Sequence, residues 1–305
     1  MGTKVAEQPN NLIRVDALPP AEMAEKAENV GVAKANLDFL TMLGLAILAG
    51  AFIALGAIFM TTVTTGAASL PFGVGKFLGG LVFCLGLILV VVAGAELFTG
   101  NNLIIMAFMS GKVTVAQLLR NWVIVYVGNF VGSLATAVMM YFSMQYRAGS
   151  GMLGANVLTI ANNKCSFGFV QALALGIMCN ALVCLAVWLT YSARTTTDKI
   201  LAIVFPITAF VAAGFEHSVA NMYIIPIGWL IKTFDPGFVA ALAEGGTAVN
   251  VAKLTLGNMF LANLLPVTIG NIIGGAGMVG LVYWGIYLRP KRAREAGAKA
   301  VTARR

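Results

Sequence analysis

Long apolar segments separated by short polar ones occupy most of this chain. Residues 39–75 contain no charged side chain, and residues 77–95 contain no strongly polar one. A helix of about twenty such residues crosses the roughly 30 Å of hydrocarbon in a bilayer. The pattern therefore predicts an all-α polytopic membrane protein. Its six predicted transmembrane helices cover residues 39–63, 77–95, 122–146, 167–191, 200–215 and 256–287.

Polar residues interrupt the second and the fifth of these helices. The second ends at Glu96, and Thr99-Gly100-Asn101-Asn102 separates it from a short apolar segment, residues 103–109. The fifth stops at Glu216-His217, and a second apolar half-segment, residues 222–231, follows. Broken backbone at membrane depth is tolerated only where protein or a water-filled cavity satisfies it. We therefore expect both breaks to face a pore.

The two breaks are copies of one motif, 120 residues apart. Glycine, glutamate and asparagine at positions 94, 96 and 101 recur at positions 214, 216 and 221. Each half then reaches a second shared signature, Gly-Asn-x-x-Gly, at residues 128–132 and 270–274. Three membrane crossings in each half give the halves opposite orientations. The sequence therefore predicts two inverted three-helix repeats, typical of transporters and channels.

His217 is the only histidine and has no counterpart in the first repeat, where Leu97 takes its place. An ionisable group at membrane depth costs about 2.5–3.5 kcal/mol on insertion scales. Histidine also changes charge near neutral pH, so we favour a functional role over a satisfied buried histidine. The duplicated polar residues either cap the breaks or face the pore; they are Glu96, Asn101, Glu216 and Asn221.

Three further positions are ambiguous from the residues alone. Phe83 and Leu87 share one helical face, which either narrows a pore or contacts lipid. Lys164, near the outer end of the fourth helix, either draws anions into a vestibule or anchors the helix at the interface.

Composition and charge support the membrane class. Hydrophobic residues make up 59% of the chain, charged residues 10%, and the mean hydropathy is +0.87. The net charge of +8 is concentrated at the end, where residues 289–305 hold seven of the twenty basic side chains. Such a tail indicates a cytoplasmic end near anionic headgroups, not nucleic-acid binding. Because fifteen of the twenty basic residues fall on the side of the termini, both termini are predicted to be cytoplasmic.

The domain boundaries follow from this pattern. Residues 1–36 form a polar cytoplasmic segment without the apolar core of a signal peptide. Pro19-Pro20 begins an amphipathic helix there, at the membrane surface or the pore mouth, although a frayed tail fits equally well. Residues 37–288 form the channel domain, with repeats at about 37–146 and 166–288, and residues 289–305 form the basic tail.

Enzymatic chemistry has little to build on in this sequence. One histidine, scattered carboxylates and four cysteines without a C-x-x-C pair predict no metal site and no cofactor. Neither break carries the Asn-Pro-Ala of a water or glycerol channel. A transport protein, not an enzyme, is the expected class.

Several motifs resemble the formate–nitrite transporter family, most closely its formate-channel branch. They are Pro71-Phe72-Gly73, residues 83–89, Ala95-Glu96-Leu97-Phe98-Thr99, Gly128-Asn129-Phe130-Val131-Gly132, residues 215–222 and residues 266–271. The resemblance covers about residues 21–289 and implies an aquaporin-like fold, a homopentamer and one pore in each protomer. Residues 95–100 are also similar to the nitrite branch, and the basic tail is longer than is usual in the family.

The resemblance also implies roles for individual residues. Thr99, in the mobile break of the second helix, faces His217 across the pore. Phe83, Leu87 and Phe210 match the hydrophobic constrictions, and Asn180 and Asn271 match polar residues that line the pore.

The implied function is a channel for small monovalent anions in the bacterial inner membrane. We expect formate to move in both directions, with His217 assisting its protonation so that a neutral species passes the apolar rings. The alternatives are a nitrite or hydrosulfide channel and a proton-coupled formate symporter. Expected partners are formate, nitrite, acetate or hydrosulfide, membrane lipids and, in a fermenting bacterium, pyruvate formate-lyase.

Overall fold

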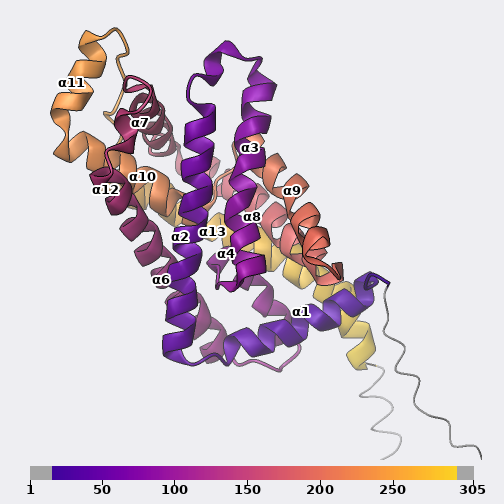
Figure 1. The fold of residues 1–305 in the computed structure, drawn as a ribbon. Coiled ribbons are helices and arrows are strands. Elements are labelled where there is room, and N and C mark those ends of the chain that lie inside the picture. Colours follow the sequence, from indigo (N-terminus) through magenta and orange to yellow (C-terminus); the bar gives the residue numbers. More distant parts are fainter. Residues whose placement is uncertain (1–15, 294–305) are drawn as a thin grey trace, which may run out of the picture.

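A computed structural model describes residues 16–293 of the chain (Figure 1). The described part is helical and contains no strand. Its longer helices are α1 (Pro20–Ala35), α2 (Phe39–Thr64), α3 (Phe72–Ile88), α6 (Val115–Phe142), α7 (Met152–Lys164), α8 (Phe169–Ser192), α9 (Thr196–Ala212), α10 (Ser218–Phe234) and α11 (Pro236–Glu244). The shorter ones are η1 (Ala67–Ser69), η2 (Leu89–Gly94), α4 (Phe98–Asn101), η3 (Asn102–Ile104), α5 (Ile105–Met109) and η4 (Gln145–Arg147). The last membrane helix joins α12 (Leu256–Asn258), η5 (Met259–Leu264), α13 (Leu265–Ile272), η6 (Ile273–Leu281) and η7 (Trp284–Leu288).

Five of the six predicted membrane helices, the first to the fourth and the sixth, correspond to helices long enough to cross a membrane. Five helices of the described part are long and apolar enough to cross a membrane, and the pair α10 and α11, bent by 86°, makes six candidates. The fifth predicted span corresponds to α9, which has 17 residues. Helix α3 packs against α2, the first helix of its repeat, and helix α9 packs against α8, the first helix of the second repeat. Helices α3 and α9 also pack against each other, so they occupy equivalent places in the two repeats.

Some boundaries differ from the prediction. Helix α6 begins at Val115, seven residues before the predicted start, because Thr114 and Gln117 form a capping box ahead of it. Residues 147–164, which lie between the third and fourth predicted membrane helices and are rich in Gly and Asn, contain α7. The side chains of Leu153, Leu158 and Ala161 are buried, and α7 packs against α10. Burial of these apolar side chains stabilises the helix despite the low helix propensity of the Gly and Asn residues. Residues 234–253, which lie outside the predicted membrane helices, likewise contain α11.

A left-handed glycine ends the helix at each break. Gly94 has φ of 90° and Gly214 has φ of 74°, a conformation that only glycine adopts without strain. The chain then runs extended before a new helix starts, at Phe98 in α4 and at Ser218 in α10. Both predicted breaks are therefore confirmed, and both are made in the same way.

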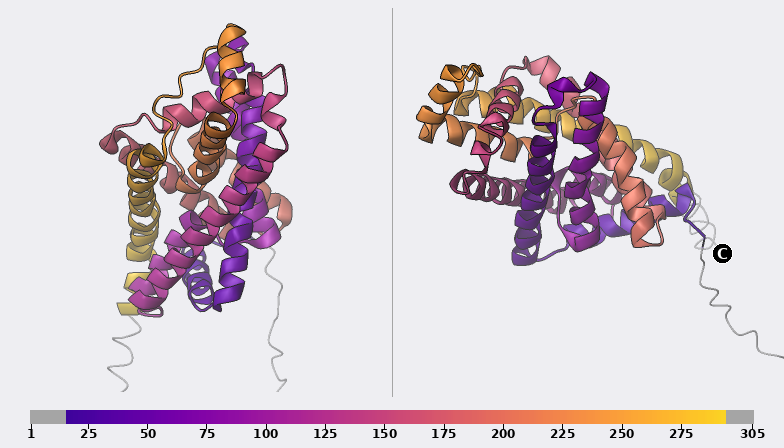
Figure 2. Two further views of the ribbon diagram at one scale, coloured as in Figure 1. Left: turned by 90° about the vertical axis from the view of Figure 1, so that its left-hand side faces the viewer. Right: turned by 45° about the horizontal axis from the view of Figure 1, so that its top comes forward.

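Helix α1 lies across the end of the bundle on the side of the termini (Figures 1 and 2). It starts at Pro20, as predicted, and buries Met23 and Ala27 against α8 and η3. Ion pairs join Glu28 of α1 to Lys112 and to Arg292. The predicted helix therefore docks on the channel domain; residues 1–15 and 294–305 lie outside the described residues.

Candidate substrate pathway

Each break is held by a buried network of lysine, glutamate and two asparagines. At the first, Lys34 Nζ lies 2.6 Å from Glu96 Oε1, and Asn101 Nδ2 donates to Glu96 Oε2 at 2.7 Å and to Asn121 Oδ1 at 2.9 Å. The backbone carbonyl of Lys34 accepts from Asn121 Nδ2. All the glutamate and asparagine side chains are buried, so the network fixes the chain where its helical hydrogen bonds stop.

The second break repeats this network with different residues. Lys164 Nζ lies 2.7 Å from Glu216 Oε1, and Asn221 Nδ2 donates at 2.7 Å both to Glu216 Oε2 and to Asn263 Oδ1. The carbonyl of Lys164 accepts from Asn263 Nδ2 at 2.9 Å. The duplicated residues of the sequence thus have duplicated partners.

One further asparagine holds the backbone of each break. Asn129 Nδ2 donates to the carbonyls of Ala46 and Glu96, and its Oδ1 accepts from Phe98 N. Asn271 does the same with Gly176, Glu216 and Ser218, at 2.8, 3.0 and 3.0 Å. The whole amide of Asn271 is therefore engaged with backbone, and its predicted pore-lining role stays a prediction.

Sequence reasoning missed three members of these networks. Lys34 was not singled out, and neither were Asn121 and Asn263. Asn121 and Asn263 stand eight residues before Asn129 and Asn271, about two helical turns, so a signal was present in the duplication. Lys34 and Lys164 are 130 residues apart, whereas the duplicated residues of the breaks are 120 apart, and the sequences around the two lysines differ. Comparing the two halves of the chain therefore does not reveal that they are equivalent.

His217 and Thr99 are in direct contact, and their predicted position on opposite sides of a pore stays a prediction. Thr99 Oγ1 lies 2.9 Å from His217 Nε2, and both residues are buried. His217 Nδ1 accepts from the backbone N–H of Ala220 at 3.0 Å, so His217 caps the start of α10. Because Nδ1 is an acceptor, the neutral ring carries its proton on Nε2 and donates it to Thr99.

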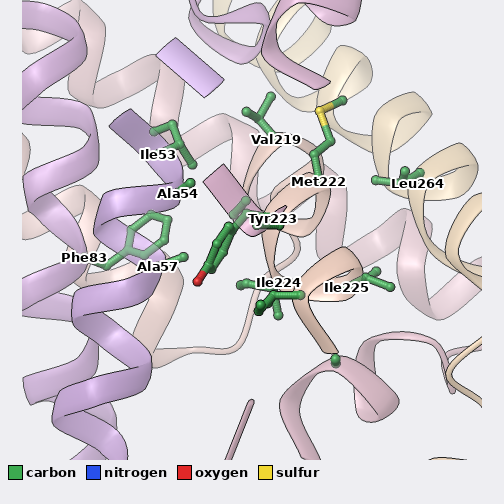
Figure 3. Close-up of a cluster of buried hydrophobic side chains, with 14 of the residues drawn as sticks. Ile53, Ala54, Ala57, Phe83, Val219, Met222, Tyr223, Ile224, Ile225 and Leu264 are labelled. Atoms are coloured by element: carbon green, nitrogen blue, oxygen red, sulfur yellow. The ribbon is translucent and has the colours of Figure 1, made fainter. Parts of the chain in front are cut away.

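Two phenylalanine rings lie next to this hydrogen bond. The rings of Phe83 and Phe210 meet edge to face with centroids 5.8 Å apart, and the Phe210 ring lies 5.9 Å from the imidazole of His217. Leu87, one turn beyond Phe83, is also buried. Figure 3 shows Phe83 beside Ala54 and Ala57 of α2. Phe210 therefore lies between Phe83 and His217, and the constriction role predicted for Phe83, Leu87 and Phe210 stays a prediction.

A cavity of about 880 Å³ reaches this constriction from the side of the α2–α3 connection. The connection lies at the end of the bundle away from α1 (Figure 1). Phe83, Phe210 and His217 line the cavity, whereas Leu87 and Thr99 do not. Its charged and titratable lining residues are Lys76, Lys164, Glu216 and His217. Lys164 lines this cavity, and its predicted role in drawing anions into a vestibule stays a prediction.

Asn180 bonds the backbone of Thr99 and does not line the cavity. Its Nδ2 donates to the carbonyls of Thr99 and Asn271 and to Asn102 Oδ1, at 3.2, 2.7 and 3.1 Å. Asn180 is buried and does not line the vestibule, so its predicted contact with a solute stays a prediction. Across residues 16–293, no group of three His, Cys, Asp or Glu side chains is placed to hold a metal ion.

Comparisons with known proteins agree with this geometry. The family model described as "Formate/nitrite transporter" matches residues 21–285. The formate channel FocA of Escherichia coli (strain K12) is 49% identical over 275 residues, covering 90% of this chain and 96% of that protein. The formate channel FocA of Haemophilus influenzae is 45% identical over 267 residues, covering 87% and 93%.

Solved structures show the same fold. A structure described as "Pentameric formate channel with formate bound" superposes with a TM-score of 0.76 at 47% identity, covering 82% of this chain and 98% of that one. An "FNT family ion channel" gives 0.73 at 28% identity, covering 87% and 98%. The chain is a multi-pass membrane transport protein and not an enzyme. It belongs to the formate/nitrite transporter family.

Proposed function

We propose that this protein is a homopentameric channel that conducts formate across the bacterial cytoplasmic membrane in both directions. Its support is the similarity to the two formate channels and to the pentameric, formate-bound structure. The observation in this chain that carries the proposal is the His217–Thr99 hydrogen bond, set directly against the Phe83 and Phe210 rings at the end of the vestibule.

The Phe83 and Phe210 rings disfavour the passage of an anion, because the anion must lose its water molecules to pass them. Burying a charge without compensating hydrogen bonds is strongly unfavourable, and a neutral acid avoids most of that free energy. His217 Nε2–H and the Thr99 hydroxyl are the polar groups next to the two phenyl rings, and they bond to each other in this closed arrangement. When a formate oxygen replaces the bond between His217 and Thr99, the same two groups can donate hydrogen bonds to the solute. The Phe83 and Phe210 rings must move apart for the solute to pass.

The hydrogen bond at His217 Nδ1 allows His217 to polarise a bound solute but hinders it from giving the solute a proton. The neutral ring has one proton, on Nε2, and cannot release it without another on Nδ1. Protonation of Nδ1 removes the acceptor that Ala220 N–H uses. Proton donation by His217 therefore requires the start of α10 to loosen, whereas polarisation does not. This predicts that pH-dependent transport is coupled to movement at residues 217–220.

The finer predictions belong to the same proposal. Nitrite, hydrosulfide and acetate are rival or additional solutes, since they share formate's size class and weak basicity. Both termini are cytoplasmic by the distribution of basic residues. Helix α1 then faces the cytoplasm, where pyruvate formate-lyase is the partner that the family resemblance implies. Membrane lipids surround the exposed apolar side chains of the bundle.

The test is solute flux into proteoliposomes by the native protein and by His217→Asn, over acidic to neutral external buffers. We expect formate flux to exceed nitrite flux, and we expect its pH response to disappear in the variant. Larger nitrite flux would contradict the formate assignment. An unchanged pH response in His217→Asn would contradict the role of His217 in proton transfer and leave it the helix cap seen here.

A further inference from the structure

Two ion pairs join the basic tail, residues 289–305, to helix α1. Lys291 Nζ pairs with Glu25 Oε1, and Arg292 Nη1 lies 3.6 Å from Glu28 Oε1. Figure 1 shows the end of the last membrane helix close to the start of α1. Two of the three basic residues of the tail that fall within the described range therefore contact carboxylates of α1.

A groove of about 760 Å³ runs along the same helix. Leu18 lines its start, and α1 contributes residues that recur every three or four positions, namely Glu22, Glu25, Lys26, Asn29, Val30 and Ala33. Ala24 and Gly31 lie on the opposite face of α1, which is buried in the bundle. The groove therefore lies on the face of α1 that the described bundle leaves accessible.

The lining of the groove carries a net negative charge. Its charged groups are the carboxylates of Glu22 and Glu25 and the ammonium group of Lys26. Lys26 Nζ donates to the backbone carbonyl of Tyr191, in α8, at 2.8 Å, so its charge is directed toward the bundle. The accessible side of the groove is thus acidic and suits a basic ligand.

The basic tail fits this groove in charge and in length. Residues 294–305 hold four basic side chains and one acidic one. Twelve residues reach about 40 Å when extended, and the groove covers roughly 20 Å of helix. This part of the tail follows directly after Arg292 and Ala293, so it starts beside Glu28. It is therefore long enough to follow the groove to either end.

Two other occupants match the groove less well. Residues 1–15 hold only two basic side chains and one acidic one, so they bring less positive charge to the carboxylates. Anionic lipid headgroups attract a basic tail, but the carboxylates of the groove repel them. Lys291 and Arg292 pair with α1, which favours α1 over lipid as the partner of the tail.

We propose that the groove on α1 binds the chain's own basic tail, with Lys291 and Arg292 as the first two contacts. The tail then holds α1 against the bundle from the solvent side. Lys34, near the end of α1, pairs with Glu96 of the first break, so a tail that holds α1 also stabilises that network. This contact between the two ends of the chain does not depend on which solute the channel conducts.

Amide hydrogen exchange of α1 tests the site. The native protein and a variant that ends at Ala293 are compared in nanodiscs of zwitterionic lipid. We expect the truncation to speed exchange within residues 20–35 roughly threefold to tenfold, the combined effect of a few exposed ion pairs. Exchange within α7, which lies toward the other end of the bundle, should be unchanged. Equal exchange of α1 in both proteins would overturn the proposal.

Two matched variants separate the charge of the tail from its length. Replacement of the four basic residues of 294–305 by glutamine keeps the length and should match the truncation. Native exchange in this variant would contradict a tail held by its charge. Deletion of residues 2–15 removes another terminal segment and should leave exchange within α1 at the native rate. A larger effect of this deletion than of the truncation would assign the groove to residues 1–15 and overturn the proposal.

Charge reversal tests the first contact directly. Glu25→Lys and Lys291→Glu should each speed exchange of α1, and the double variant should restore most of the native protection because the pair forms again with its charges exchanged. The side chains of Glu25 and Lys291 are 44% and 50% exposed, so neither substitution disturbs the core. A loss in the double variant as large as the two single losses together would contradict the pairing.

Membrane composition distinguishes lipid from α1 as the partner of the tail. The truncation is repeated in nanodiscs that contain phosphatidylglycerol, an anionic lipid. We expect its effect on α1 to persist there at a similar size. An effect that appears only in the phosphatidylglycerol membranes would assign the tail to anionic headgroups and overturn the proposal.

Discussion

The two breaks share a scaffold and differ in the residues that meet in the middle. Gly94, Glu96 and Asn101 have their copies at positions 214, 216 and 221, with matching partners. Among the unmatched positions are Leu97 opposite His217 and Thr99 opposite Val219. Each break thus supplies a polar residue that the other lacks at these two positions, and His217 and Thr99 form the 2.9 Å hydrogen bond. The duplicated residues form the hydrogen-bond networks of the two breaks, whereas the residues in contact at the centre are not duplicated.

The largest expected effect comes from removing the lysine of either network. Lys164→Met leaves Glu216, 3% exposed, as an unpaired buried charge, which should lower the free energy of unfolding by about 3–5 kcal/mol. Lys34→Met should cost less, because Lys34 and Glu96 are 26% and 7% exposed. Chemical unfolding of the detergent-solubilised protein measures both. Equal losses would show that the two networks are energetically alike despite their different burial.

The paired asparagines should show no such difference. Asn129→Leu and Asn271→Leu each remove one hydrogen bond from a backbone N–H and two to backbone carbonyls, so each should lose about 2–4 kcal/mol. The same unfolding experiment tests this, and the two losses should agree with each other. A much smaller loss for Asn271→Leu would return that residue to the pore-lining role predicted for it.

Making the first break resemble the second should impair transport and spare the fold. Thr99→Val, which copies Val219, removes the hydroxyl bonded to His217 and should reduce the formate rate up to about tenfold, as one neutral hydrogen bond allows. The control is Thr99→Ser, which keeps the hydroxyl and should retain most of the rate. Equal rates in the valine and serine variants would remove Thr99 from the transport step. Proteoliposome flux at saturating formate provides the measurement.

The smallest expected effect concerns a contact outside the two repeated frames, where Asp235 accepts hydrogen bonds from Tyr146 and Arg147. Burial raises the pKa of Asp235, but the hydrogen bonds from Tyr146 and Arg147 outweigh it and hold that pKa below its ordinary value. A carboxyl with a lowered folded-state pKa stabilises the fold above its unfolded pKa and loses that contribution as pH falls through the folded value.

Asp235→Asn should therefore remove a small, acid-sensitive part of the stability and leave transport unchanged. Thermal unfolding between neutral and strongly acidic pH should show the native and variant curves converging as the pH falls. A difference that persists undiminished in acid would mean that Asp235 acts through packing and not through its charge. Because Arg147 is half exposed, the effect is expected to be slight.

Periodicity and duplication located the frame well and the connections poorly. Uninterrupted apolar runs predicted α2, α8 and the last membrane helix within a few residues, because membrane helices need a fixed apolar length. The starts of α3 and α6 were missed by five and seven residues, since Pro71 and the Thr114 cap decide them and not hydropathy. Helix α7 was missed because its composition is rich in Asn and Gly. Its apolar residues stabilise the helix only by packing against α10, which the sequence does not show.

By itself the sequence determined the class of protein, the inverted duplication, both helix breaks and the residues that differ between them. These follow from local composition and from comparing one half of the chain with the other. Only the tertiary structure decided that Lys34 and Lys164 pair with the two glutamates and that His217 caps α10 through Nδ1. Most of these contacts join residues from different helices, so they depend on how helices pack and on which rotamers that packing allows.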